Sequence, residues 1–162
     1  MTTKTTGKSA PAAAPKSQKA TTLLRADHKL VSALFADYDK ARSPVKKQQL
    51  VAQICTELTV HAQVEAEIFY PAFKAALKDK ELVPEATVEH ATLKELIAQV
   101  KGVEPDGEMF DAKIKVLSEY VKHHVKEEQN EMFPKAESSK LDMVELGAAL
   151  AERKAELLAE RV

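Results

Sequence analysis

The sequence predicts an all-α protein: an antiparallel up-down four-helix bundle with an extra C-terminal helix and a disordered N-terminal tail. Three observations support this fold class. The 162 residues include only 4 Gly, which argues against a turn-rich sandwich or barrel. From residue 21 onward, apolar side chains recur at steps of three and four, the period of a helix. The connections between the helical segments are short, so neighbouring helices must be antiparallel.

Composition and the single cysteine narrow the class further. Hydrophobic residues make up 44% and charged residues 30% of the chain, as in ordinary globular domains. Cys55 alone excludes a disulfide within the chain and a Cys-rich zinc module, and we interpret it as a buried apolar residue. No apolar run is long enough to span a bilayer, and the start lacks the apolar segment of a secretory signal. We therefore expect a cytoplasmic protein.

Residues 1–20, rich in Lys, Ala, Pro and Thr, are predicted to form the disordered tail, because they cannot bury enough apolar surface to offset their ordering entropy. Residues 1–22 carry four Lys and no acid, whereas the remainder holds 20 basic and 25 acidic residues. We interpret the tail as a solvated extension, with a weak electrostatic arm for nucleic acid as the alternative. A mitochondrial transit peptide fits less well, since the tail lacks arginine.

The first two helices of the bundle lie on either side of Ser43-Pro44, the expected N-cap and first residue of the second helix. Pro71 is expected to kink or end that second helix. The inward face of the first helix comprises Leu24, His28, Val31 and Phe35. The inward face of the second comprises Leu50, Ile54, Leu58 or Glu57, His61, Glu65, Ile68 and Ala72.

Pro84 is expected to open the third helix, a turn cluster covers residues 102–107, and Pro134 is expected to close the fourth helix. The bundle thus spans residues 21–136. In the C-terminal segment 137–162, Ser139 and Asp142 resemble a capping box for a fifth helix over Leu141–Arg161, which either caps the bundle or forms a dimer contact. The inward residues of helices three and four are Ala86, His90, Leu93, Ile97 and Val100, then Phe110, Ile114, Leu117, Val121, His124, Glu128 and Met132.

An internal repeat of one helical hairpin carries the functional signal. Asp27-His28 matches Glu89-His90, 62 residues later, and the His61 to Glu65 segment matches the His124 to Glu128 segment, 63 residues later. His and Glu at positions i and i+4 share one face of a helix, and here that face is the apolar one. Two such hairpins packed about a pseudo-two-fold axis would bring four His and two Glu together inside the bundle.

A metal explains why carboxylates would lie on an apolar face. Without a partner, each buried carboxylate would suffer a large desolvation cost, and two facing carboxylates would repel each other. Imidazole and carboxylate ligands in a helical bundle suit iron or manganese, often as a pair bridged by the carboxylates. Zinc is less apt because it prefers four ligands and usually recruits Cys or a dense set of His. The predicted ligands are His28, His61, Glu65, His90, His124 and Glu128.

These motifs resemble the hemerythrin-like HHE cation-binding family over about residues 21–136. The resemblance rests on DHKLV at 27–31, HAQVEAEIFYP at 61–71, VEHATLKEL at 88–96 and HHVKEEQNEMFP at 123–134. It implies a non-haem di-iron centre, two Fe per chain, in which the six predicted ligands hold the metal and the two Glu bridge it together with an oxo or hydroxo group.

The sequence departs from the oxygen-storage members of that family at two positions. Those members are similar in having a second His on helix three, four residues after the first, where this sequence has Lys94. They also have an Asp one residue farther from the His of helix four than Glu128 is from His124. Of the twelve positions around two six-coordinate irons, the His and Glu residues would fill eight and a bridging oxygen two. Two positions remain for water or substrate, which favours peroxide, nitric oxide or iron-handling chemistry over oxygen storage.

Several further residues could fill these positions or orient the ligand histidines, whose second ring nitrogen usually needs a partner. His123 is expected at the surface or beside the ligands, and Glu67, Glu127 and Glu131 are interpreted as solvated charge. The candidates for extra ligands or hydrogen-bond partners are Glu57, Tyr70, Tyr120, Asp27 and Glu89.

The leading hypothesis is a di-iron protein that binds or reacts with O2, peroxide or nitric oxide, and catalase-like or peroxidase-like activity is an open question. The alternatives are an iron sensor or iron donor without catalysis, and a structural bundle with a basic interaction tail. The expected partners are a small diatomic or peroxide ligand and, as oligomer, a monomer or homodimer. No membrane partner is expected, and no nucleic acid apart from weak contact by the tail. No nucleotide fingerprint or His-Glu-x-x-His pattern is present, which excludes a zinc metalloprotease of that type.

Overall fold

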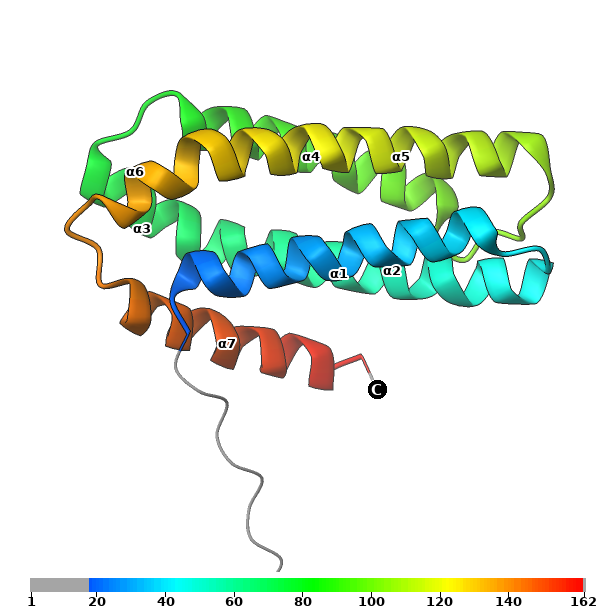
Figure 1. Ribbon diagram of the computed structural model, residues 1–162, viewed down its shortest axis with the longest axis horizontal. Coiled ribbons are helices and arrows are strands. Elements are labelled where there is room, and N and C mark those ends of the chain that lie inside the picture. The colour runs from blue at the N-terminus through cyan, green and yellow to red at the C-terminus, as the bar shows by residue number, and fades with distance from the viewer. Residues whose placement is uncertain (1–17, 162) are drawn as a thin grey trace, which may run out of the picture.

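The computed structural model describes residues 18–161, and its regular elements are all helices (Figure 1). Helices α1 (Ala20–Lys40) and α2 (Pro44–Val64) form one hairpin, and α4 (Leu82–Val100) and α5 (Glu108–Glu127) form the other. The four helices pack as the predicted antiparallel up-down bundle. The prediction of a disordered tail falls on residues 1–17, outside the described residues, and on 18–20, where Ala20 already begins α1. The division of the chain at residues 20 and 136 stays a prediction.

Capping side chains set where the helices begin. Ser43 caps α2 as predicted, since its hydroxyl accepts a hydrogen bond from the Lys46 N–H at 3.1 Å. Helix α4 begins at Leu82, two residues before Pro84, because the Asp79 carboxylate accepts from the next free backbone N–H groups, those of residues 82 and 83. The prediction that Pro84 opens the third helix is therefore two residues late.

The C-terminal helix α7 (Met143–Ala159) begins two residues later than predicted. Asp142 is its N-cap, and the carboxylate accepts from the N–H groups of Val144 and Glu145. Ser139 does not cap it, because its hydroxyl donates to the carbonyl of Ala136 instead. The predicted capping box is thus wrong, and Asp142 alone satisfies the first turn.

Two π-helical segments carry the helices past their prolines. Segment η1 (Glu65–Phe69) joins α2 to α3 (Tyr70–Leu77), and η2 (Glu128–Met132) joins α5 to α6 (Phe133–Glu137). The N–H groups of the residues after them donate to the carbonyls of Glu65 and Glu128, five residues back. Proline lacks an N–H and clashes with the carbonyl four residues earlier, and the wider π turn absorbs this defect. Pro134 therefore does not close its helix, and Pro71 does not end the second one.

The apolar core consists of two clusters with the His and Glu residues between them along the helices. One cluster, rich in Phe69, Phe73 and Phe133, lies at the end that carries α3, α6 and α7. The other, which includes Ile54 and Leu117, fills the opposite end. The predicted inward positions are buried or half-buried. Of the two alternatives on α2, Leu58 is the buried residue and Glu57 is not.

Helix α7 caps one face of the bundle, one of its two predicted roles. It packs across α1 and α2, on the far side of the bundle from α4 and α5 (Figure 1). Leu150 and Leu157 are buried in this contact. A Cβ at Gly147 would lie 1.8 Å from the carbonyl oxygen of Gln18, so only glycine permits this close approach. Within residues 18–161, no helix is long and apolar enough to cross a membrane.

Candidate metal centre

The bundle brings the four predicted His and two predicted Glu together at its centre. Each main helix supplies one His, and the two Glu are the first residues of η1 and η2. Nε2 of His28 lies 3.1 Å from Nε2 of His61 and 3.1 Å from Oε1 of Glu128. Oε1 of Glu65 lies 3.0 Å from Nε2 of His61 and 3.4 Å from Nε2 of His90. Glu65 thus contacts histidines of both hairpins.

These side chains form two groups that share one carboxylate. The first cluster is His28, His61, Glu65 and Glu128, and the second cluster is Glu65, His90 and His124. Within each cluster, the potential ligand atoms all lie within 4.8 Å of one another. Two ligands at right angles on a metal about 2.1 Å away lie about 3.0 Å apart, close to the contacts of 3.0–3.5 Å seen here.

The polar groups of this centre are not satisfied by one another. Glu65 is fully buried and Glu128 is 4% exposed, yet both carboxylate oxygens of Glu65 and Oε1 of Glu128 have no hydrogen-bond partner. Orphaned buried carboxylate oxygens are costly. Their lone pairs and those of the imidazoles converge on the same space, which fits bound cations of the iron or manganese type.

Acidic residues of neighbouring helices fix the imidazole orientations. His61 donates from Nδ1 to Asp27 at 2.9 Å, and His124 donates from Nδ1 to Glu89 at 3.2 Å. In each case Nε2 is left free to bind a metal. Asp27 and Glu89 therefore lie beside the centre, and each contacts the His of the next helix rather than the adjacent His in sequence.

Electrostatics couple the buried charges strongly. Burial alone would lower the pKa of His61, but Glu65 and Asp27 raise it well above its ordinary value. Burial would likewise raise the pKa of Glu65, but His61 holds it well below the usual range. The pKa of His124 rises to about 9, because hydrogen bonding and charge from Glu128 outweigh its burial. Without metal, His61 and His124 thus carry a proton beside the carboxylates, and metal binding would require each to lose it.

Tyr70 lies between the two clusters and donates a hydrogen bond to Glu128 of the first. Its hydroxyl donates to Oε2 of Glu128 at 2.5 Å and lies 3.2 Å from Nε2 of His90 and 3.4 Å from Nε2 of His124. Burial, and then the carboxylates of Glu65 and Glu128, raise the pKa of Tyr70 well above its ordinary value. The inward position expected of Tyr70 is therefore present, and its hydroxyl stays protonated at neutral pH.

A small void of about 20 Å³ lies against the four histidines on the side away from Tyr70's helix. A volume of this size holds about one water molecule. Apart from Asp27, its other walls are apolar, and the largest of them are Val31, Leu58, Leu93 and Val121. This void therefore suits a group of a few atoms beside the histidines.

Two of the predicted candidates lie away from the centre. Glu57 is half-buried in a groove between α1 and α2, because Leu58 takes the inner position one turn before His61. Tyr120 is half-buried in a groove on the outer face of α4 and α5, beside His123. Neither side chain contributes to the two clusters.

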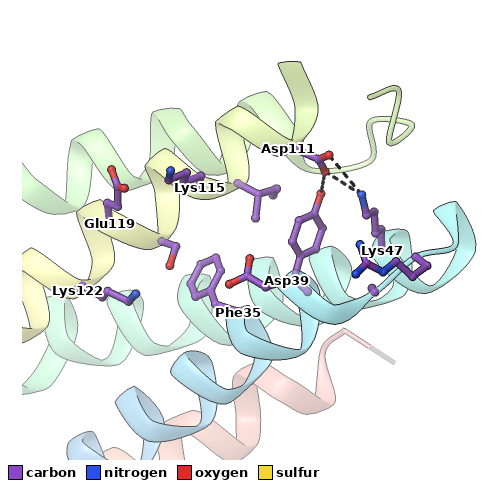
Figure 2. A pocket seen from close by; sticks show the side chains of 12 residues that line it. Phe35, Asp39, Lys47, Asp111, Lys115, Glu119 and Lys122 are labelled. Atoms are coloured by element: carbon purple, nitrogen blue, oxygen red, sulfur yellow. Dashed lines mark hydrogen bonds and ion pairs between the residues drawn. The ribbon is translucent and has the colours of Figure 1, made fainter. Parts of the chain in front are cut away.

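A larger cavity of about 530 Å³ lies between α1 and α5, away from the metal candidates (Figure 2). Figure 2 shows Asp111 as its polar anchor, since this carboxylate accepts from Lys47 at 3.0 Å and from the Tyr38 hydroxyl at 2.6 Å. Tyr38 and Lys47 together lower the pKa of Asp111. The remaining charges, such as Lys115 and Glu119, are of both signs, which gives this cavity no clear ligand preference.

Three residues that touch the centre were missed by the sequence reasoning. The side-chain amide of Gln129 lies 2.9 Å from Nδ1 of His28. The Phe133 ring stacks on His28 with centroids 5.9 Å apart. Lys154 of α7 donates to Asp27 at 2.5 Å. The repeat did not indicate Gln129, because its counterpart in the other hairpin is Ala66. The sequence of α7 did not indicate which face of the bundle this helix would cover.

An antiparallel bundle with one inward His on each of its four helices and a buried Glu after two of them is typical of a metal-binding helical protein. The chain belongs to the hemerythrin HHE cation-binding domain family, whose model matches residues 19–136, as the sequence motifs predicted. A solved hemerythrin HHE cation-binding-domain protein from Mycobacterium kansasii has the same fold, with a TM-score of 0.77, 21% identity and coverage of 88% of this chain and 89% of that one.

A relative from Nostoc sp., described as a DNA nickase, is 30% identical over 111 residues. The match covers 68% of this chain but only 31% of the Nostoc protein. The chain therefore spans about a third of that relative's length.

Proposed function

We propose that the chain holds two iron ions between its four His and two Glu, and that this centre binds or reacts with O2, peroxide or nitric oxide. The observation that carries the proposal is the set of buried carboxylate oxygens of Glu65 and Glu128 that lack any hydrogen-bond donor while two His clusters share Glu65. Imidazole and carboxylate ligands together suit iron or manganese. Membership of a cation-binding family supports metal as the missing partner.

Bound iron would supply electrons and Lewis acidity for the reduction of O2 or peroxide. The chain's own residues would bind, orient and limit access. Asp27 and Glu89 hold the rings of His61 and His124 with Nε2 inward. Tyr70 keeps a proton 2.5 Å from Glu128, where it can be donated to a reduced ligand. The void beside the histidines, about 20 Å³, would favour a ligand of one or two heavy atoms over larger substrates.

Adding peroxide to anaerobically iron-loaded protein distinguishes a catalytic role from reversible ligand binding. An oxygen electrode would follow the conversion of two peroxides into two waters and one O2. We expect sustained O2 release that is lost in the His61→Ala and Glu65→Ala variants. A reversible change of absorbance with O2 or nitric oxide, without turnover of peroxide, would instead favour a carrier. Iron-loaded protein that responds to none of the three ligands would contradict the proposed function.

An iron sensor or iron donor without catalysis is the second candidate, favoured by the buried charges. Metal-free protein that must bury the orphaned carboxylates of Glu65 and Glu128 is expected to be less stable than loaded protein. Thermal unfolding with and without iron measures this difference. Equal midpoints would count against a sensing role. The structural bundle with a basic interaction tail remains a third candidate, and its tail lies outside the described residues.

The name of the Nostoc relative motivates a nickase control. The description as a DNA nickase applies to the whole Nostoc protein, of which the match to this chain covers 31%. Supercoiled plasmid would be incubated with iron-loaded protein, with and without a peroxide scavenger. Nicking that survives the scavenger and is lost on His61→Ala would favour a nuclease role over the proposed function.

A further inference from the structure

The outer face of α4 and α5 carries a second group of ligating side chains, which we call the outer triad: Glu89, His123 and Glu127. Nε2 of His123 lies 3.2 Å from Glu127 and 4.0 Å from Glu89. The sequence HHVKEE holds the spacing His-x-x-x-Glu twice, offset by one residue. The inner pair, His124 and Glu128, is buried, whereas the His123 side chain is 62% exposed. The outer triad is therefore open to solvent.

A narrow cleft leads from this face to the buried centre. Its lining passes from exposed Glu85 and Glu131, through half-buried Glu89 and Glu127, to buried groups of the centre. Its volume of about 20 Å³ suffices for one water molecule or ion. At its inner end lies Glu128, 4% exposed, whose Oε1 has no hydrogen-bond partner. We call this feature the acidic cleft.

Glu89 connects the outer triad to the centre directly. Its Oε1 accepts from Nδ1 of His124 at 3.2 Å, while its Oε2 faces His123 at 4.0 Å. One carboxylate thus contacts an inner and an outer histidine. A cation held at the outer triad would lie one side chain away from the second cluster.

The repeat shows that the fold does not require these charges. The counterparts of Glu85, His123, Glu127 and Glu131 in the first hairpin are Leu23, Val60, Val64 and Ile68. Those four apolar residues pack in the cluster that contains Leu150 and Leu157 of α7. The counterpart of Glu89 is Asp27, which Lys154 of α7 neutralises. One hairpin is thus closed by α7, and the other presents acids and a histidine on the uncovered side (Figure 1).

We propose that the outer triad is a third, solvent-facing divalent-cation site through which Fe²⁺ enters the buried centre along the acidic cleft. One imidazole and two carboxylates, with water completing the shell, suit Fe²⁺ or Mn²⁺. The charged side chains along the outer part of the cleft are all acidic, and such a surface concentrates cations and speeds their capture. The inference rests on the proposed function, since it assumes that iron fills the buried centre.

Uptake kinetics test the route. Metal-free full-length chain is mixed anaerobically with Fe²⁺, and a strong ferrous chelator is added at set times. Iron that has reached the buried centre is protected from the chelator, and the amount of protected iron per chain is measured. We expect Glu127→Gln and His123→Asn to slow protection at least about tenfold and to reach the wild-type final content. Glu119→Gln makes the same charge change on the exposed face of α5 and should match wild type.

Wild-type rates in both variants would overturn the route while leaving the proposed function intact. No protected iron in the wild type at any time would overturn the proposed function, and the inference with it. Raising the salt concentration should slow the wild type more than Glu127→Gln, because screening weakens the attraction of the cleft.

Equilibrium binding tests the site itself. Mn²⁺ is titrated into iron-loaded protein, and the electron paramagnetic resonance signal of free Mn²⁺ reports how much is bound. We expect one Mn²⁺ per chain in wild type and in Glu119→Gln, and none in His123→Asn or Glu127→Gln. Absence of Mn²⁺ binding in the wild type, or full binding in both variants, would refute an outer site.

Discussion

Tyr70 is the residue at which the two halves of the centre differ most. Its counterpart in the repeat is Phe133, which stacks on His28 and has no proton to give. Tyr70 instead donates to Glu128 at 2.5 Å and approaches the His90 ring nitrogen. His28 thus packs against an apolar ring, whereas His90 and His124 face a hydroxyl. This asymmetry places the tyrosyl proton beside Glu128, His90 and His124.

Replacement of Tyr70 by Phe removes a hydrogen bond to a buried carboxylate. Hydrogen bonds to charged groups contribute about 1.5–3 kcal/mol, so Tyr70→Phe should destabilise the metal-free protein by about that amount. Urea unfolding measures the difference. Tyr120→Phe is the matched control, because Tyr120 is half-buried on the outer groove, and it should change stability by less than about 0.5 kcal/mol. Equal losses in the two variants would contradict the assigned hydrogen bond.

The six central residues could be predicted because the repeat places them on equivalent inner faces. His28 and His90 are adjacent in sequence to Asp27 and Glu89, which made acidic partners predictable, but the sequence did not show that each acid serves the next helix. Gln129 could not be predicted, since its contact with His28 joins α1 to η2 across 101 residues. Side chains that break the repeat depend on tertiary packing.

At the scale of elements, the π segments and α7 shape the centre most. Both π segments begin at a central Glu and end before a proline. The prolines were visible in the sequence, but the π turns before them were not predicted, and Pro134 does not close its helix. A π turn satisfies the backbone by donating five residues back, an option that helical periodicity alone does not indicate. The extra residue per turn changes which side chains face inward after Glu65 and Glu128.

Helix α7 places one positive charge, Lys154, beside the first cluster. Lys154 donates to Asp27, which accepts from His61. Burial alone would raise the pKa of Asp27, but His61 and Lys154 lower it overall. Lys154→Met should therefore loosen the metal in the first cluster alone. Changes to the hydrogen-bond partners of ligands typically cost about 10–100-fold in metal affinity.

Competition with a ferrous chelator measures this effect. We expect Lys154→Met to release one of two irons per chain at about tenfold lower chelator concentration than wild type. Arg153→Met removes the neighbouring cation of α7, which pairs with exposed Glu67, and should release both irons as wild type does. Equal release of both irons from Lys154→Met would contradict the link from α7 to the first cluster.

At the scale of the whole molecule, the buried charged side chains make the metal-free protein most stable in a limited interval of pH. The pKa of His124 is about 9 in the fold against an ordinary 6.5, so its contribution is complete below pH 6.5 and is lost as pH rises towards 9. The lowered pKa values of Asp27 and Glu65 give contributions that are present above their ordinary pKa values and are lost as pH falls.

Metal-free protein should therefore be most stable near about pH 5–6.5. Urea midpoints between about pH 4 and 9, taken after removal of metal by a chelator, check this maximum. Iron-loaded protein should keep its stability up to higher pH, because metal ligation uses neutral histidine. A metal-free midpoint that rises between pH 6.5 and 9 would contradict the assigned pairing of His124.

Iron content per chain is the most direct test of the central claim. Full-length protein, loaded anaerobically and freed of excess metal, is analysed for iron and zinc beside Glu65→Gln and Glu67→Gln. Glu65 is shared by both clusters, whereas Glu67 lies two residues away and is exposed. We predict two irons per chain in wild type and Glu67→Gln, and one or none in Glu65→Gln. A wild type without iron, or with zinc in its place, would contradict the di-iron account.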